Sequence, residues 1–194
     1  MHFFFDIETA GMPKKYKAPH TEISSWPRIT QIAWIAFDMN KKLVDHQTYI
    51  IKPDGFEIPV ESANRNGITT EIAMEQGVPV EEMLEKFAAA IRPAKYLVAH
   101  NMNGQEKIIA AEFFRKQIKH VLFDTERICV MQESTHYCKI PGSHGRYKWP
   151  SQKELYLKLY KKTPQGLHNA ALDVKVTANC FYTLVKIGAI DEFE

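Results

Sequence analysis

The order of strand-like and helix-like segments is the feature that most restricts the fold of this chain. An aromatic, apolar segment at the start is followed by two strand-like segments joined by a Met39-Asn40-Lys41 turn, which predicts a hairpin. Helical and strand-like patterns then alternate. The expected strands are residues 2–7, 28–38, 42–52, 95–99 and 120–124, and the expected helices are 69–76, 80–92, a helix ending at Lys119, 151–161 and 169–187. This order predicts an α/β fold whose mixed central sheet has about five strands, the second antiparallel, flanked by helices.

The composition narrows the class of protein. A length of 194 residues predicts a single domain over residues 1–194, and 45% hydrophobic residues exclude a disordered chain. A net charge of +2 argues against a strongly basic, histone-like protein. The three cysteines form no C-x-x-C pair, so we expect reduced thiols. The sequence shows no signal peptide or membrane-spanning run, and these observations together predict a cytoplasmic protein without membrane contacts.

Two acidic side chains lie at the end of the first expected strand. Asp6 and Glu8 are two residues apart, so on a strand both side chains point to the same face. Neighbouring carboxylates repel each other unless a cation lies between them, and Mg²⁺ or Mn²⁺ prefers such oxygen ligands. The alternative is a solvated acidic strand end.

Two further polar pairs lie where sites form in α/β proteins. His168 precedes Asp173 by five residues at the start of the last expected helix, where a histidine can act as a general base. His100 and Asn101 follow the fourth expected strand. Taken alone, each pair is better explained without a function: His168 and Asp173 as a capping histidine and an exposed aspartate, and His100 and Asn101 as a polar turn into a helix.

The three motifs occur together, in one order, and this combination resembles the DEDDh class of 3′–5′ exonucleases. This DnaQ-like family includes the proofreading ε subunit of bacterial DNA polymerase III, ribonuclease T and oligoribonuclease. The motif segments are Phe5–Thr9, Val98–Asn101 and His168–Asp173, with further similarity at Arg28–Ala33, Asn66–Thr69 and Asp124–Thr125.

The resemblance implies a ribonuclease H-like fold and a two-metal mechanism. Asp6, Glu8 and Asp173 are then the ligands of two Mg²⁺ or Mn²⁺ ions, and His168 is the general base. The implied substrate-binding residues are Thr9, Gly11 and Met12 in the turn after the first motif, together with His100 and Asn101.

The second motif departs from the family pattern, which runs H-N-x-x-F-D and ends in a metal-site aspartate. Here Gly104 replaces the aromatic residue and Gln105 replaces the aspartate. An amide brings an oxygen without a charge, so the second ion is expected to bind more weakly. Glu106 follows directly, but on a helix it points about 100° away from Gln105.

Basic and acidic residues are separated along the chain. Residues 139–162 contain seven basic residues and one acidic residue, interleaved with Tyr147 and Trp149, a pattern that suits single-stranded nucleic acid. Within this segment we expect Arg146 and Lys148 to bind substrate. Residues 53–86 contain eight acidic and two basic residues, so we expect them to lie away from the substrate.

These observations favour a metal-dependent 3′–5′ exonuclease acting on single-stranded DNA or RNA 3′ ends, with activity weakened by Gln105. A catalytically impaired nucleic-acid-binding relative is the alternative, and a hydrolase of nucleotides or short oligonucleotides is a third reading. A DNA polymerase or another replication or repair protein is a candidate partner.

Overall fold

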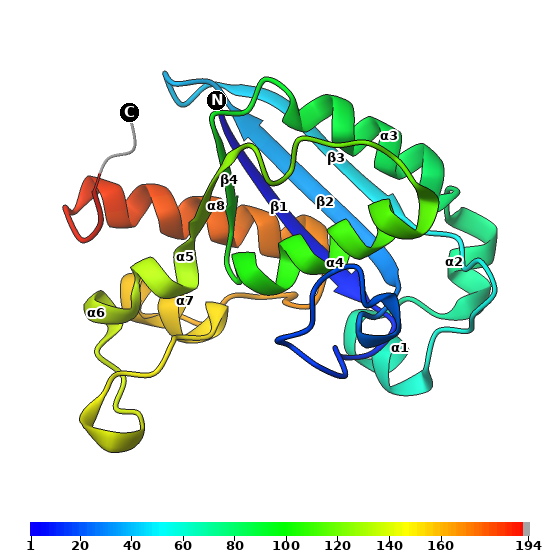
Figure 1. Cartoon of the computed structure of the whole chain (residues 1–194). Helices are drawn as coiled ribbons and strands as arrows, with labels where there is room; N and C mark the ends of the chain where they lie inside the picture. Colours follow the sequence, from blue (N-terminus) through cyan, green and yellow to red (C-terminus); the bar gives the residue numbers. More distant parts are fainter. Residues whose placement is uncertain (192–194) are drawn as a thin grey trace.

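A five-stranded mixed sheet forms the centre of the computed structural model, which describes residues 1–191 (Figure 1). The strands lie in the order β3-β2-β1-β4-β5. β2 is antiparallel to β1 and β3, whereas β4 is parallel to β1 and β5, so the predicted mixed sheet with an antiparallel second strand is confirmed. The strands are β1 (His2–Thr9), β2 (Ile29–Phe37), β3 (Leu43–Ile50), β4 (Tyr96–Ala99) and β5 (Glu126–Cys129).

Helices cover both faces of the sheet, and this determines the direction of the β1 side chains. Phe3 and Phe5 belong to the core formed with α3 (Val80–Ile91) and α4 (Met102–Lys116). Phe4 belongs to the opposite core, formed with α8 (Ala170–Lys186). Figure 1 shows α8 behind the sheet and α4 in front of it. Since neighbouring residues alternate between faces, the even-numbered acidic residues at the end of β1 point toward α8.

The remaining helices are short. They are α1 (Val60–Asn66), α2 (Thr70–Gln76), α5 (Val130–Glu133), α6 (Thr135–Cys138) and α7 (Gln152–Tyr160). α7 begins with a capping box formed by Ser151 and Glu154. α8 ends at Lys186 with Ile187 as its C-cap, and Gly188, with a left-handed φ of +66° that favours glycine, follows directly.

The expected element order misplaced the fifth strand and lacked the short helices α1, α5 and α6. Residues 120–124 form a turn in which the Asp124 amide donates to the Val121 carbonyl, and the fifth strand is Glu126–Cys129 instead. Only half of β5 is buried, so it lacks an apolar run to reveal it. The sequence also gave no sign of α1, because Ser62 and Asn66 are its only buried side chains.

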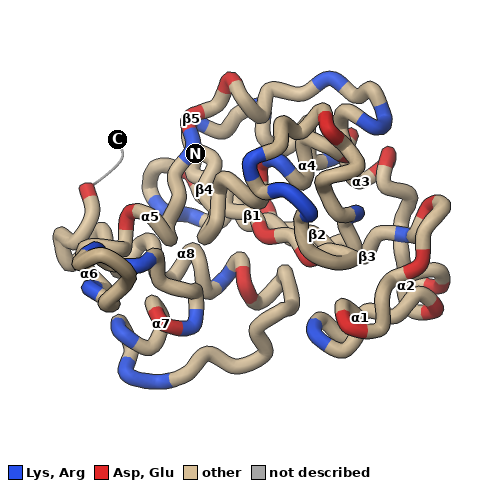
Figure 2. Tube along the Cα trace, turned by 60° about the horizontal axis from the view of Figure 1, so that its bottom comes forward, with Lys and Arg blue, Asp and Glu red and all other residues tan. Residues whose placement is uncertain are grey.

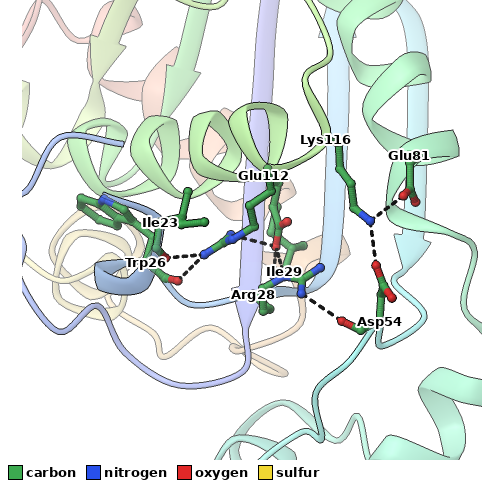
Figure 3. A network of polar contacts seen from close by, with 9 residues as sticks. Ile23, Trp26, Arg28, Ile29, Asp54, Glu81, Glu112 and Lys116 are labelled. Atoms are coloured by element: carbon green, nitrogen blue, oxygen red, sulfur yellow. Dashed lines mark hydrogen bonds and ion pairs between the residues drawn. The ribbon is translucent and has the colours of Figure 1, made fainter. Parts of the chain in front are cut away.

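A buried carboxylate attaches the segment after β1 to α4 (Figure 3). Glu112 of α4 is completely buried and accepts a hydrogen bond of 2.8 Å from Arg28 Nε. Arg115 Nη1 lies 3.3 Å from the same carboxylate oxygen, and its Nη2 donates to the carbonyls of Ile23 and Trp26. This network therefore fixes residues 10–28, the loop that leaves the acidic end of β1.

Two further properties of the fold concern the burial of its cysteines and the length of its helices. Cys129, Cys138 and Cys180 are buried free thiols. Within residues 1–191, no helix combines the length and apolar content needed to cross a bilayer.

Candidate active site

Three buried carboxylates and an imidazole meet at the junction of β1 and α8. Asp6 and Glu8 come from the end of β1, and Asp173 comes from the first turns of α8; they are 7%, 6% and 5% exposed. One ligand atom each of Glu8, Asp173 and His168 lies within 4.8 Å of the others. Asp6 is close enough for Asp173 and Glu8 to raise its pKa by repulsion. The structure thus brings together all four residues predicted to be catalytic.

The start of α8 is positioned by a residue of the sheet. Gln31 lies opposite Glu8 in the β1–β2 pairing, and its Oε1 accepts a hydrogen bond of 2.8 Å from the Ala170 amide. Asn169 caps the helix by accepting from the Ala171 amide at 3.1 Å. Gln31 was not predicted to support the site, although a polar residue inside an apolar strand was a usable signal.

The backbone of His168 explains the five-residue spacing of the third motif. His168 has a left-handed φ of +70° and lies one residue before the helix cap. Its amide donates to Asp173 Oδ2 at 2.8 Å, and the residues between donor and acceptor form the cap and first turn of α8. The side chain itself is exposed. Partial desolvation of the ring, then the nearby Arg65, lowers the pKa of His168, which favours the neutral imidazole that can accept a proton.

Burial and mutual repulsion make the carboxylates costly to ionise. Burial, then repulsion from Asp173, raises the pKa of Glu8 to about 7. Burial raises the pKa of Asp173 to about 6 and raises the pKa of Asp6 well above its usual value. Asp173 Oδ1 is buried and has no hydrogen-bond partner among the described residues. The ionised carboxylates therefore carry more negative charge than the one nearby guanidinium, Arg65, can balance.

The second motif places an amide beside Asp6. Gln105 Nε2 donates to Asp6 Oδ1 at 3.0 Å, while Gln105 Oε1 is buried without a partner among the described residues. A Cβ on Gly104 would lie 2.9 Å from the Asn101 side-chain nitrogen, so a larger residue would require that side chain to shift. Glu106 points away and pairs with Arg127 at 3.2 Å.

His100 and Asn101 have partners within the protein rather than in the carboxylate cluster. His100 Nε2 lies 3.0 Å from the Pro150 carbonyl, and burial lowers the pKa of His100 to about 4. Asn101 caps α4 by accepting from the Gly104 amide at 3.4 Å. Both residues thus shape the start of α4, and their role in substrate binding stays a prediction.

The turn after β1 begins directly after the strand end that carries Glu8. Thr9 Oγ1 donates to the Gly11 carbonyl at 2.7 Å, and Gly11 has a φ of +104°, which favours glycine. Met12 is 61% exposed beyond the turn. A flexible apolar side chain here is available to contact a nucleotide.

α1 contributes two residues that the sequence analysis placed away from the substrate. Arg65 Nη2 lies 4.0 Å from Glu8 Oε2, and an Asn66 side-chain hydrogen bond lowers the pKa of Glu8. The expectation that residues 53–86 lie away from the site was therefore wrong at this helix. The net acidity of the segment concealed it, since most of the acidic residues lie on other parts of the segment (Figure 2).

The basic segment 139–162 contains a short hairpin. The Gly142 amide donates to the Arg146 carbonyl at 2.8 Å, and the Lys148 amide donates to the Ile140 carbonyl at 3.0 Å. Lys148 Nζ pairs with Glu154 at 2.6 Å, so part of its charge is already neutralised. Tyr147 and Trp149 are 44% and 56% exposed. Figure 2 shows basic positions along this hairpin and α7.

Known proteins share this fold. E. coli Exonuclease I in complex with a dT13 oligonucleotide superposes with a TM-score of 0.73 at 18% identity, over 95% of this chain and 40% of that chain. The zinc-bound E. coli Exonuclease I–ssDNA complex gives 0.72 at 19% identity, over 96% and 40%. Exonuclease I from Methylocaldum szegediense gives 0.72 at 17% identity, over 95% and 40%.

The present chain thus spans about 40% of the length of these solved structures. No curated protein matches the sequence significantly. The exonuclease family model RNase_T matches residues 3–181, which include all three motifs and nearly every element described above. The chain therefore belongs to the RNase_T family of exonucleases.

Proposed function

We propose that this protein is a metal-dependent 3′–5′ exonuclease that releases nucleotides from single-stranded DNA or RNA 3′ ends. One observation carries the proposal: three buried carboxylates with raised pKa values meet a neutral imidazole at the start of α8. Such a cluster is stable in its ionised form only when cations balance it. Hydrolysis of a phosphodiester bound at this cluster needs cations to offset its charge and a base to accept a proton from water.

The residues present fit divalent cations. Asp6, Glu8 and Asp173 would hold them, because carboxylate oxygens suit Mg²⁺ and Mn²⁺ and because Asp173 Oδ1 has no partner among the described residues. The unpartnered Oε1 of Gln105 adds a neutral oxygen beside Asp6. Bound ions would lower the pKa of a water molecule and offset the charge of the phosphate.

Residues of this chain supply the remaining roles. His168 accepts the proton of the attacking water, and its exposed position leaves the ring open to substrate. The Thr9–Met12 turn contacts the terminal nucleotide. The hairpin around Arg146 and Lys148 holds the strand further from its end, with Tyr147 and Trp149 stacking on bases.

The solved relatives make DNA the first substrate to test. Exonuclease I from E. coli was crystallised with dT13 and dA16 oligonucleotides. We further propose a cytoplasmic location, where buried thiols stay reduced, with a DNA polymerase or another replication or repair protein as candidate partner.

Gln105 favours a second candidate, a nucleic-acid-binding protein with little turnover. Its amide donates a hydrogen bond to Asp6 at the position where the second motif of the family carries an aspartate. A neutral group there reduces the charge that attracts a second cation.

Cleavage of a 5′-labelled single strand separates the two candidates. Wild type, Gln105→Asp and the control Gln132→Asp, which changes an exposed glutamine of α5, are incubated with Mg²⁺ or Mn²⁺. The exonuclease proposal expects wild type to shorten the strand stepwise from its 3′ end, and Gln105→Asp to do so faster. Tight binding without cleavage, with cleavage gained only in Gln105→Asp, favours the binding protein. If no variant binds or cleaves the strand, both candidates are contradicted.

A further inference from the structure

The guanidinium of Arg65 lies at the edge of the carboxylate cluster without a strong partner. Arg65 Nη2 is 4.0 Å from Glu8 Oε2, and Nη1 is 3.5 Å from the Met12 sulfur. A charge-assisted hydrogen bond between nitrogen and oxygen is about 2.7–2.9 Å long, and a thioether is a weak acceptor. Both contacts therefore leave the donors of Arg65 available to a better acceptor.

The backbone around Arg65 holds this group in place. Arg65 is in the last turn of α1, which ends at Gly67 with a φ of +76°. The neighbouring Asn66 is 9% exposed, accepts from the Ile68 amide at 3.0 Å and donates to Thr30 Oγ1 at 3.4 Å. Arg65 thus projects from an anchored helix end, and its side chain remains 35% exposed.

Arg65 also faces the groups that meet the substrate. It lies near His168 as well as Glu8, since its charge lowers the pKa of both. Its contact with Met12 places it beside the turn that we assign to the terminal nucleotide. A planar guanidinium with several donors matches the oxygens of a phosphate.

We propose that Arg65 binds the terminal, scissile phosphate directly and supplies a permanent positive charge to the side of the site formed by Glu8 and His168. This inference rests on the proposed function. The competing explanation is that Arg65 only neutralises Glu8.

A binding cycle distinguishes the two explanations without measuring cleavage. Two fluorescent single strands are compared, one with ordinary linkages and one with a neutral methylphosphonate at the 3′-terminal linkage. Their affinities for wild type and Arg65→Met are measured by anisotropy in Ca²⁺, with strand integrity verified on gels. For each protein, the methylphosphonate penalty is the factor by which the neutral linkage weakens binding. Metal contacts to the phosphate are common to both proteins, so the ratio of the wild-type penalty to the Arg65→Met penalty isolates the contribution of Arg65.

A direct contact predicts that the methylphosphonate penalty is about tenfold larger in wild type than in Arg65→Met, as expected for a hydrogen bond to a charged group. Arg65→Lys keeps part of this difference. The control Arg92→Met, which removes an exposed arginine at the end of α3, keeps all of it. A methylphosphonate four linkages upstream shows no dependence on Arg65.

Equal penalties in wild type, Arg65→Met and Arg65→Lys overturn the assignment and leave only the neutralisation of Glu8. Thermal unfolding of each variant verifies that it is folded. If wild type binds neither strand, the proposed function is wrong, and the role of Arg65 is lost with it.

Discussion

Replacing Glu8 by glutamine tests the electrostatic account of the site through stability. Burial and Asp173 raise the pKa of Glu8 from 4.5 to about 7, and this value already includes the attraction of Arg65. The folded protein therefore binds more protons than the unfolded chain between these pH values, so its stability falls as pH rises through this window. The ionised carboxylate costs about 3 kcal/mol above pH 7. Glu8→Gln removes this cost.

Urea unfolding in EDTA at pH 4.5 and pH 8 measures the effect. We expect Glu8→Gln to be more stable than wild type by about 2–3 kcal/mol at pH 8 and by less than about 1 kcal/mol at pH 4.5. The control Glu85→Gln changes an exposed glutamate of α3 and is expected to show no such difference between the two pH values. A pH-independent effect of Glu8→Gln, or destabilisation at pH 8, would refute the reasoning.

Three further predictions follow from the same contacts. The rate of cleavage rises between pH 6 and 8 as Asp173 (pKa about 6) and Glu8 (pKa about 7) ionise. A higher Mn²⁺ concentration moves this rise to lower pH, because cations displace protons from the carboxylates. A pH–rate profile that does not change with Mn²⁺ concentration contradicts the prediction. His168→Ala lowers kcat by about 10²–10⁴-fold while thermal stabilisation by Mn²⁺ is retained, measured by single-turnover cleavage and thermal unfolding. Glu112→Ala destabilises the fold by about 3–5 kcal/mol in urea, since it removes the buried carboxylate that balances the partly buried Arg28 and Arg115. Glu82→Ala in an exposed pair costs less than about 1 kcal/mol.

The sheet was predictable because the apolar composition of its central strand, β1, indicates that the strand is buried. β1 is buried along its whole length, and the apolar run Phe3–Phe5 followed by Asp6 and Glu8 indicated a buried strand with acidic residues near its end. β5 and α1 were not predictable in this way. Each buries too few side chains to impose a period on the sequence.

The candidate site was predictable where spacing alone fixes geometry. Asp6 and Glu8 share a face because strands alternate. The start of the last expected helix singled out His168 and Asp173, and the resemblance assigned their roles. Contacts between distant segments carry no such pattern. Gln31 reaches α8 across 139 residues, and the position of Arg65 depends on the anchoring of the end of α1 to β2 through Asn66 and Thr30.

The most direct test of the central claim is cleavage of a 5′-labelled single-stranded oligonucleotide by wild type and Asp173→Asn, with Mn²⁺ or with EDTA. The account predicts a ladder of products shortened from the 3′ end that requires Mn²⁺ and disappears in Asp173→Asn, because this buried carboxylate has a ligand atom within 4.8 Å of Glu8 and His168. Absence of shortening by wild type at high Mn²⁺, or an equal ladder from Asp173→Asn, would contradict it.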